Sequence, residues 1–145
     1  MQRDTIVGVT FLIILGVSCL YVLGGKEDTH QYQSSTKWMW NDYSTALEKA
    51  KTENKYVLID FWATWCTECK KMDRIAFQDS EVQYLLEDFV LLKVDVDAVP
   101  QLKSQFLVAG LPTIVIVDGE GEEVTRAIGY QSPEQMKKVL REVLS

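Results

Sequence analysis

The sequence contains few residues of the kinds that bind transition metals: three cysteines and one histidine among 145 residues. A structural zinc site needs four such ligands, and beyond Cys66 and Cys69 the chain offers only Cys19 and His30, both near its N-terminus. Covalent attachment of a c-type haem requires a histidine directly after the second cysteine, where this chain has Lys70. We therefore expect no metal and no haem.

The chain also lacks an excess of basic charge and a complete nucleotide-binding motif. Its formal net charge is -6, which does not favour nucleic acid or anionic lipid headgroups as partners. The segment "DGEGEE" at residues 118–123 has neither the full glycine spacing nor the following helix of a dinucleotide fingerprint. We expect no bound cofactor and no nucleic-acid partner.

No charged side chain occurs between Thr5 and Gly25. A helix of that length spans roughly 30 Å, the thickness of a bilayer's hydrocarbon core. We expect residues 1–25 to form one transmembrane helix that is retained as an anchor, because a cleaved signal peptide has a shorter apolar region and a small-residue exit site. Cleavage stays open as an alternative, as does lipid attachment at Cys19, since "LGVSC" faintly resembles a lipoprotein processing site.

The charges beside this segment bear on its orientation. Arg3 and the N-terminal amine favour a cytoplasmic N-terminus, whereas Asp4 and Lys26 weaken the charge bias. The simplest arrangement places everything after Lys26 outside the cytoplasm, on the periplasmic side.

The remaining chain divides into a linker and one domain. Residues 26–36, "KEDTHQYQSST", are polar without apolar periodicity and are expected to be a linker. Residues 37–145 are expected to form a single domain, which we expect to be monomeric. The overall composition, 47% hydrophobic and 25% charged, is typical of a globular protein.

Apolar periodicity predicts alternating helices and strands in this domain. Two helix starts have capping-box spacing, one at Ser80 with Gln83 and one at Ser132 with Gln135, where Pro133 follows the cap. The predicted helices are 41–55, 66–77, 80–89, 99–106 and a last helix from 132 onward; the predicted strands are 56–62, 89–97, 112–118 and 122–129. This order indicates an α/β fold with a mixed central sheet flanked by helices.

The pair Cys66 and Cys69 follows a predicted buried strand and starts a predicted helix. The free N–H groups and the roughly half positive charge at a helix N-terminus stabilise a thiolate on Cys66. Cys69, one turn further on, is placed to attack a mixed disulfide formed by Cys66. A purely structural disulfide is the alternative, although so small a loop restrains the unfolded chain little. We interpret Cys66 as a nucleophile and Cys69 as the resolving thiol.

Several segments resemble the thioredoxin superfamily. They are "VLIDFWATWCTECK", "LLKVDVDA", "GLPT" and "IGY", and the match covers residues 56–130. Within that superfamily, "WCTECKKMD", "AFQDSEVQ" and "GLPTIVIVDGEGEE" are similar to the C-terminal periplasmic thioredoxin-like domain of the thiol:disulfide interchange proteins called DsbD. The resemblance implies a thioredoxin fold and a redox-active disulfide. It also implies electron transfer from a membrane partner to oxidised periplasmic proteins, including those that serve cytochrome c assembly.

The resemblance further implies roles for three charged residues. Asp60 matches a buried aspartate that relays the proton of the resolving thiol, its alternative being a solvated strand residue. Asp73 shares a helix face with both cysteines and matches a second acidic group, or is a plain solvated helix residue. Lys93 matches a lysine beside the buried aspartate, or is an ordinary lysine on a partly exposed strand.

The resemblance also implies a substrate-binding rim. Pro112 matches a proline that follows a cis peptide bond and holds the backbone of Leu111 against the substrate. Trp65 is expected to line an apolar rim around the sulfurs, as is Trp62 unless it belongs to the core.

Thr67 and Glu68 stand between the two cysteines and are expected to contact the substrate. The carboxylate of Glu68 opposes a thiolate nearby, and a less stable thiolate makes a more reducing couple. We therefore expect a membrane-tethered thiol:disulfide reductase or electron relay that needs a separate membrane donor. The alternatives are an oxidase or isomerase of the same fold, or a redox-inert binding module.

Overall fold

The computed structural model describes residues 37–145. The expected anchor and linker, residues 1–36, lie outside the described residues. Within the described part of the chain no helix combines the length and the hydropathy that crossing a membrane requires.

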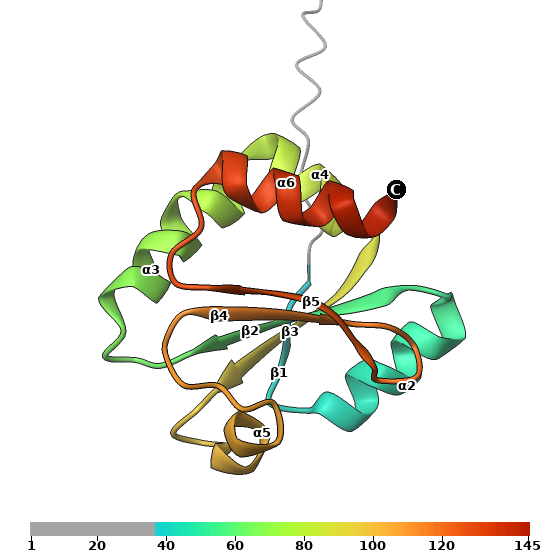
Figure 1. Ribbon diagram of the computed structural model, residues 1–145, viewed down its shortest axis with the longest axis horizontal. Helices are drawn as coiled ribbons and strands as arrows, with labels where there is room; N and C mark the ends of the chain where they lie inside the picture. Colours follow the sequence, from blue (N-terminus) through green and yellow to red (C-terminus); the bar gives the residue numbers. More distant parts are fainter. Residues whose placement is uncertain (1–36) are drawn as a thin grey trace, which may run out of the picture. The chain divides into compact units, whose positions relative to one another are not determined.

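The described residues contain one sheet with the strand order β1-β3-β2-β4-β5 (Figure 1). β1 and β2 run parallel to β3, whereas β4 is antiparallel to both β2 and β5, so the predicted mixed sheet is confirmed. The strands are β1 (Met39–Trp40), β2 (Tyr56–Trp62), β3 (Phe89–Asp95), β4 (Thr113–Val117) and β5 (Glu123–Ile128).

Helices cover both faces of the sheet, which confirms the predicted α/β architecture (Figure 1). α2 and α5 lie on one face, and α3, α4 and α6 lie on the other. The helices are α2 (Tyr43–Glu53), α3 (Thr67–Arg74), the 3-10 turn η1 (Ala76–Gln78), α4 (Ser80–Leu86), α5 (Pro100–Gln105) and α6 (Pro133–Leu144).

β2 is central and positions the site. It lies between β3 and β4, and its inner residues from Val57 to Phe61 are all buried, which explains why its sequence is almost continuously apolar. Ile59 and Phe61 pack with the α2 side of the core, and Leu58 packs with the α3, α4 and α6 side. Asp60 points to the same face as Leu58 because successive side chains of a strand alternate.

The structure corrects the end of the predicted helix 66–77. α3 stops at Arg74, and η1 follows after Ile75. The change of course directs Phe77 into the core, where it is 4% exposed and packs edge-on against Trp38 with ring centroids 5.0 Å apart. Burial of this aromatic ring is the physical reason for the early end of the helix.

The structure also corrects one predicted cap and confirms the other. α4 begins at Ser80 as expected, but its N-cap is Asp79, whose carboxylate accepts hydrogen bonds from the backbone N–H groups of Glu81 and Val82 at 3.1 and 3.0 Å. Gln83 instead donates to the carbonyl oxygen of Phe77. The capping box that starts α6 is present as predicted.

We predict that Asp79→Ala lowers the free energy of unfolding by about 1 kcal/mol, because two N–H groups of the first turn lose their acceptor. Ser80→Ala is the matched control and should change it by no more than about 0.5 kcal/mol. Urea denaturation of both variants checks this. A larger loss of unfolding free energy in Ser80→Ala than in Asp79→Ala would show that Ser80 is the N-cap, as the sequence predicts.

Candidate active site

Cys66 and Cys69 are joined by a disulfide at the start of α3. Cys66 is the N-cap residue, and its sulfur accepts a hydrogen bond from the backbone N–H of Cys69 at 3.2 Å. Cys66 is 6% exposed and Cys69 is 1% exposed. The N–H donor and the helix dipole therefore favour negative charge on the outer sulfur, that of Cys66.

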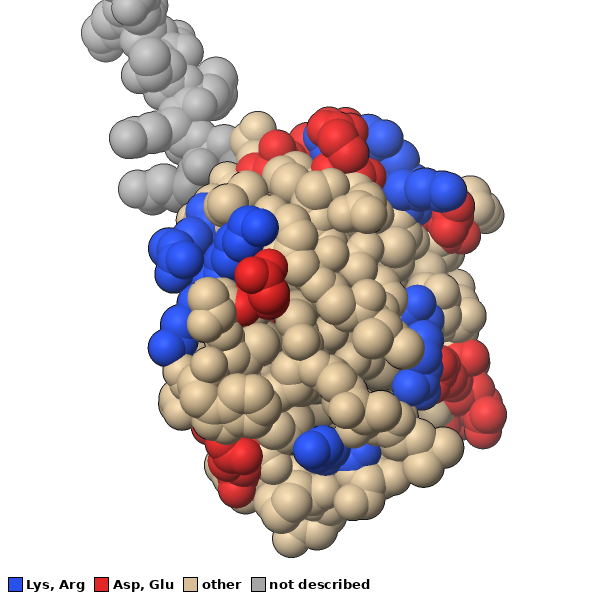
Figure 2. All heavy atoms as spheres, turned by 60° about the vertical axis from the view of Figure 1, so that its left-hand side comes forward, with Lys and Arg blue, Asp and Glu red and all other residues tan. Residues whose placement is uncertain are grey.

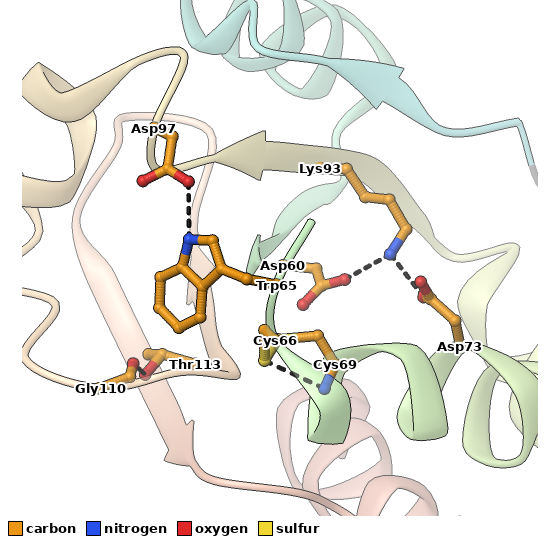
Figure 3. Close-up of a disulfide and its surroundings, with 9 residues drawn as sticks. All are labelled: Asp60, Trp65, Cys66, Cys69, Asp73, Lys93, Asp97, Gly110 and Thr113. Carbon is orange, nitrogen blue, oxygen red and sulfur yellow. Dashed lines mark hydrogen bonds and ion pairs between the residues drawn. A yellow bond between two sulfur atoms is a disulfide. The ribbon is translucent and has the colours of Figure 1, made fainter. Parts of the chain in front are cut away.

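A buried ion-pair cluster lies beside the disulfide (Figure 3). Lys93 is the cross-strand partner of Asp60, and its ammonium donates to Asp60 Oδ2 at 2.6 Å and to Asp73 Oδ1 at 2.5 Å. β2, β3 and α3 thus each contribute one charged side chain. The Asp60 side chain projects between the cysteine pair and Lys93 in this view.

The structure shows how far each of these three residues is exposed to solvent. Asp60 is 1% exposed and Lys93 is 6% exposed, so neither is a solvated strand residue. The Asp73 side chain remains 35% exposed but is ion-paired, so it belongs to the cluster. Asp60 Oδ1 is buried and has no hydrogen-bond partner among the described residues.

Burial dominates the electrostatics of the cluster. Burial raises the pKa of Asp60, and the nearby Asp73 adds to this, while the Lys93 ammonium opposes it without cancelling it. Burial alone would lower the pKa of Lys93, but attraction and hydrogen bonding from the two carboxylates together raise it. Asp60 is consequently a carboxyl group that takes up a proton more readily than an exposed aspartate.

We predict that Asp60 makes the oxidised protein less stable as the pH rises. Between the ordinary carboxyl pKa, 3.8, and the higher folded value, the folded state holds a proton that the unfolded chain has lost. The stability of Asp60→Asn relative to the native protein should therefore improve as the pH increases through this window. Urea denaturation across a pH series measures it, with the exposed Asp88→Asn as control; parallel curves for the native protein and Asp60→Asn would contradict the prediction.

The rim of the site carries the residues that were expected to meet a substrate. Trp65 is 66% exposed, and its indole N–H donates to Asp97 Oδ2 at 2.8 Å. Thr67 and Glu68 are exposed in the first turn of α3, and Glu68 lies 3.7 Å from the ammonium of Lys71. Trp62 is partly buried against the core, as the alternative for it stated.

The loop before β4 forms the other side of the rim. The Leu111–Pro112 bond is cis, as expected from the resemblance, and Leu111 packs against the same core cluster that includes both cysteines. Thr113 fixes the loop by donating from its hydroxyl to the Gly110 carbonyl at 2.8 Å. Figure 3 shows Gly110 and Thr113 on the Trp65 side of the disulfide.

Sequence reasoning missed three residues that support the site. Asp97 holds Trp65, while Trp38 and Phe77 lie 4.9 and 5.3 Å from the Lys93 ammonium. Their sequence positions carry no spacing signal, because each contact joins segments that meet only in the folded chain. The described residues contain no group of three or more His, Cys, Asp or Glu side chains that could hold a metal ion.

Comparison with known proteins places this site in a family. A thioredoxin-like domain family matches residues 43–144. The thioredoxin of Alicyclobacillus acidocaldarius is 35% identical over 98 residues, which are 68% of this chain and 90% of that protein. DsbD of Photorhabdus laumondii is 34% identical over 125 residues, 81% of this chain, so the chain spans only about a fifth (22%) of that relative.

Solved structures agree with these matches. A thioredoxin from Thermus thermophilus superposes with a TM-score of 0.66 and 32% identity, over 74% of this chain and 87% of that one. The oxidised C-terminal domain of Neisseria meningitidis DsbD superposes with a TM-score of 0.63 over 72% of this chain and 97% of that one; at 23% identity it supports the fold alone. With its Cys66–Cys69 disulfide at the start of α3, the chain belongs to the thioredoxin-like family of thiol:disulfide oxidoreductases.

Proposed function

We propose that this protein is a membrane-tethered reductase or electron relay that reduces disulfides of oxidised extracytoplasmic proteins through the Cys66–Cys69 pair. The observation that carries the direction of electron flow is the set of carboxylates around the pair. Asp60 and Asp73 lie in the cluster beside it, and Glu68 is exposed between the cysteines. The two aspartates share the single ammonium of Lys93, so with Glu68 the carboxylates outnumber the cations; this excess of negative charge opposes a thiolate, and a destabilised thiolate makes the reduced form a stronger reductant.

The geometry supports a two-step exchange. The Cys66 thiolate attacks one sulfur of the substrate disulfide, forming a mixed disulfide and releasing the substrate's other sulfur as a thiolate. Asp60 then takes the proton of Cys69, whose thiolate attacks the Cys66 sulfur and releases the second substrate thiolate. Two electrons pass to the substrate, and this protein ends with its own disulfide. The raised pKa of Asp60 suits a group that accepts a proton in the second step.

The surface around the disulfide suits a protein substrate. Figure 2 shows the end of the domain that carries the start of α3, and its centre is formed by uncharged side chains with most charges along the border. Trp65 and Ile128 are each 66% exposed. Ile128 pairs with Thr113, so it lies beside the Leu111–Pro112 loop. Such an apolar area favours docking of another polypeptide.

The proposed exchange requires a separate electron donor, because each cycle leaves Cys66 and Cys69 oxidised and the pair must be reduced again. The resemblance to the C-terminal domain of DsbD proteins implies a membrane protein as donor and oxidised periplasmic proteins, including those of cytochrome c assembly, as acceptors. An anchor in residues 1–25 and the linker 26–36 would keep a monomeric domain near such a donor on the periplasmic side. Tethering raises the local concentration without new contacts.

Measuring the reduction potential in glutathione buffers tests the proposed direction. We expect a value near that of thioredoxin, about -270 mV, or lower. Glu68→Gln should raise it by no more than about 30 mV, because the removed charge is exposed and partly screened. The control Glu142→Gln on α6 should leave it unchanged. A potential near about -120 mV, as in strong oxidants, would assign the oxidase alternative instead.

A further inference from the structure

Three aromatic rings surround the ammonium group of Lys93. They come from three separate segments: Trp38 precedes β1, Trp62 ends β2, and Phe77 lies in η1. Their ring centroids lie 4.9, 5.7 and 5.3 Å from Lys93 Nζ, and the Lys93 side chain is 7% exposed. These rings are called the Lys93 cage below.

The Lys93 cage restricts a side chain that is otherwise flexible. A lysine ammonium is a strongly hydrated charge on a four-carbon stem, so it moves toward water where it is free to do so. Asp73 is 35% exposed and marks a route toward solvent, whereas Asp60 is 1% exposed. Aromatic faces within about 6 Å attract the ammonium and exclude water, which keeps it at the buried carboxylate.

The protonation of Asp60 depends on the position of the Lys93 ammonium. Its Oδ2 atom has the Lys93 ammonium as partner, and its Oδ1 atom has none among the described residues. The charged groups that act on Asp60 are Lys93 from β3 and Asp73 from α3. Displacement of Lys93 would leave a buried carboxylate with only a like charge nearby.

We propose that Trp38 is a positioning residue of the redox site, whose ring holds the Lys93 ammonium against Asp60 while Cys69 completes the exchange. Trp38 contributes the shortest of the three ring contacts and also packs edge-on against Phe77, so it supports a second wall of the Lys93 cage. The effect of Trp38 on the exchange rests on the proposed function, in which Asp60 accepts the proton of Cys69. The placement of the Lys93 ammonium by Trp38 can be tested independently of that function.

The first test is a carboxyl NMR titration of Asp60 in the oxidised full chain. Trp38→Leu should raise the titration midpoint by about half to one pH unit, since the opposing ammonium is lost, and Trp38→Phe should restore most of the native value. Tyr56→Leu is the matched control and should leave the midpoint unchanged, because Tyr56 packs against the same core cluster as Trp38 but its ring contacts Phe89, which is not part of the Lys93 cage. Should Trp38→Leu not fold, Phe77→Leu removes another wall and predicts a shift of the same direction.

The second test measures how the rate of substrate release from the mixed disulfide depends on pH. In Trp38→Leu this pH profile should move to higher pH by the same amount as the titration midpoint of Asp60. A merely structural tryptophan would lower the unfolding temperature without moving either midpoint, and that result overturns the inference. A shift in the titration without a shift in the release profile supports the positioning role and removes the proton relay from the proposed function.

Discussion

Replacing Cys69 with serine is expected to leave oxidised partner proteins covalently attached to Cys66. The mixed disulfide forms normally, because Cys66 keeps the N–H donor of residue 69, but the thiol that resolves it is missing. Cys66→Ser should form no adduct, and both variants should reduce a disulfide substrate no faster than the uncatalysed reaction. Non-reducing gels of the full chain, followed by mass spectrometry of the bands, give the result and identify the partners.

The third cysteine provides the control for this experiment. Cys19→Ser should leave both the activity and the adducts of the Cys69→Ser background unchanged, because Cys19 lies outside the domain that carries the disulfide. Absence of adducts in Cys69→Ser, with normal folding, would favour the redox-inert binding module. Adducts that still form when Cys66 is replaced by serine would show that another residue is the nucleophile.

Asp60→Asn is expected to slow release of the reduced substrate by roughly 100-fold while slowing the first attack by much less. The amide cannot accept the proton of Cys69, whereas Cys66 already reacts as a thiolate. Stopped-flow fluorescence separates the two steps, since Trp65 reports docking at the rim and is 66% exposed. Equal slowing of both steps would show that Asp60 acts on the potential of the pair and not as a proton acceptor.

Asp73→Asn is the comparison for that variant. Asp73 also binds Lys93, but its side chain is 35% exposed and water screens its charge. The rate of substrate release should therefore fall several-fold less in Asp73→Asn than in Asp60→Asn. An effect as large as that of Asp60→Asn would make Asp73 the proton acceptor.

Elements with a strong local signal could be predicted from the sequence. β2 has the continuous apolar run of a strand buried on both faces, and α6 begins with a complete capping box and Pro133. For α4, the spacing between Ser80 and Gln83 predicts a cap at Ser80, but Asp79, one residue earlier, is an equally good capping residue and is the N-cap in the structure. Local patterns cannot rank two adjacent capping residues.

Features that depend on distant segments could not be predicted. β1 has only two residues and exists because it pairs in parallel with β3, more than fifty residues later. The Lys93 cage likewise forms where the start of the domain, β2 and η1 converge. The resemblance predicts Lys93 beside Asp60, but the contact of Lys93 with Asp73 and its three aromatic neighbours depend on how β3 packs against α3, η1 and the start of the domain.

The most direct measurement is the rate of alkylation of each thiol in the reduced protein, located by mass spectrometry across a pH series. Because the Cys66 sulfur accepts an N–H at the helix start and Cys69 lies one turn deeper, iodoacetamide should modify Cys66 at least about tenfold faster at every pH. Equal rates at the two thiols, with the pH dependence of an ordinary free cysteine, would contradict the account.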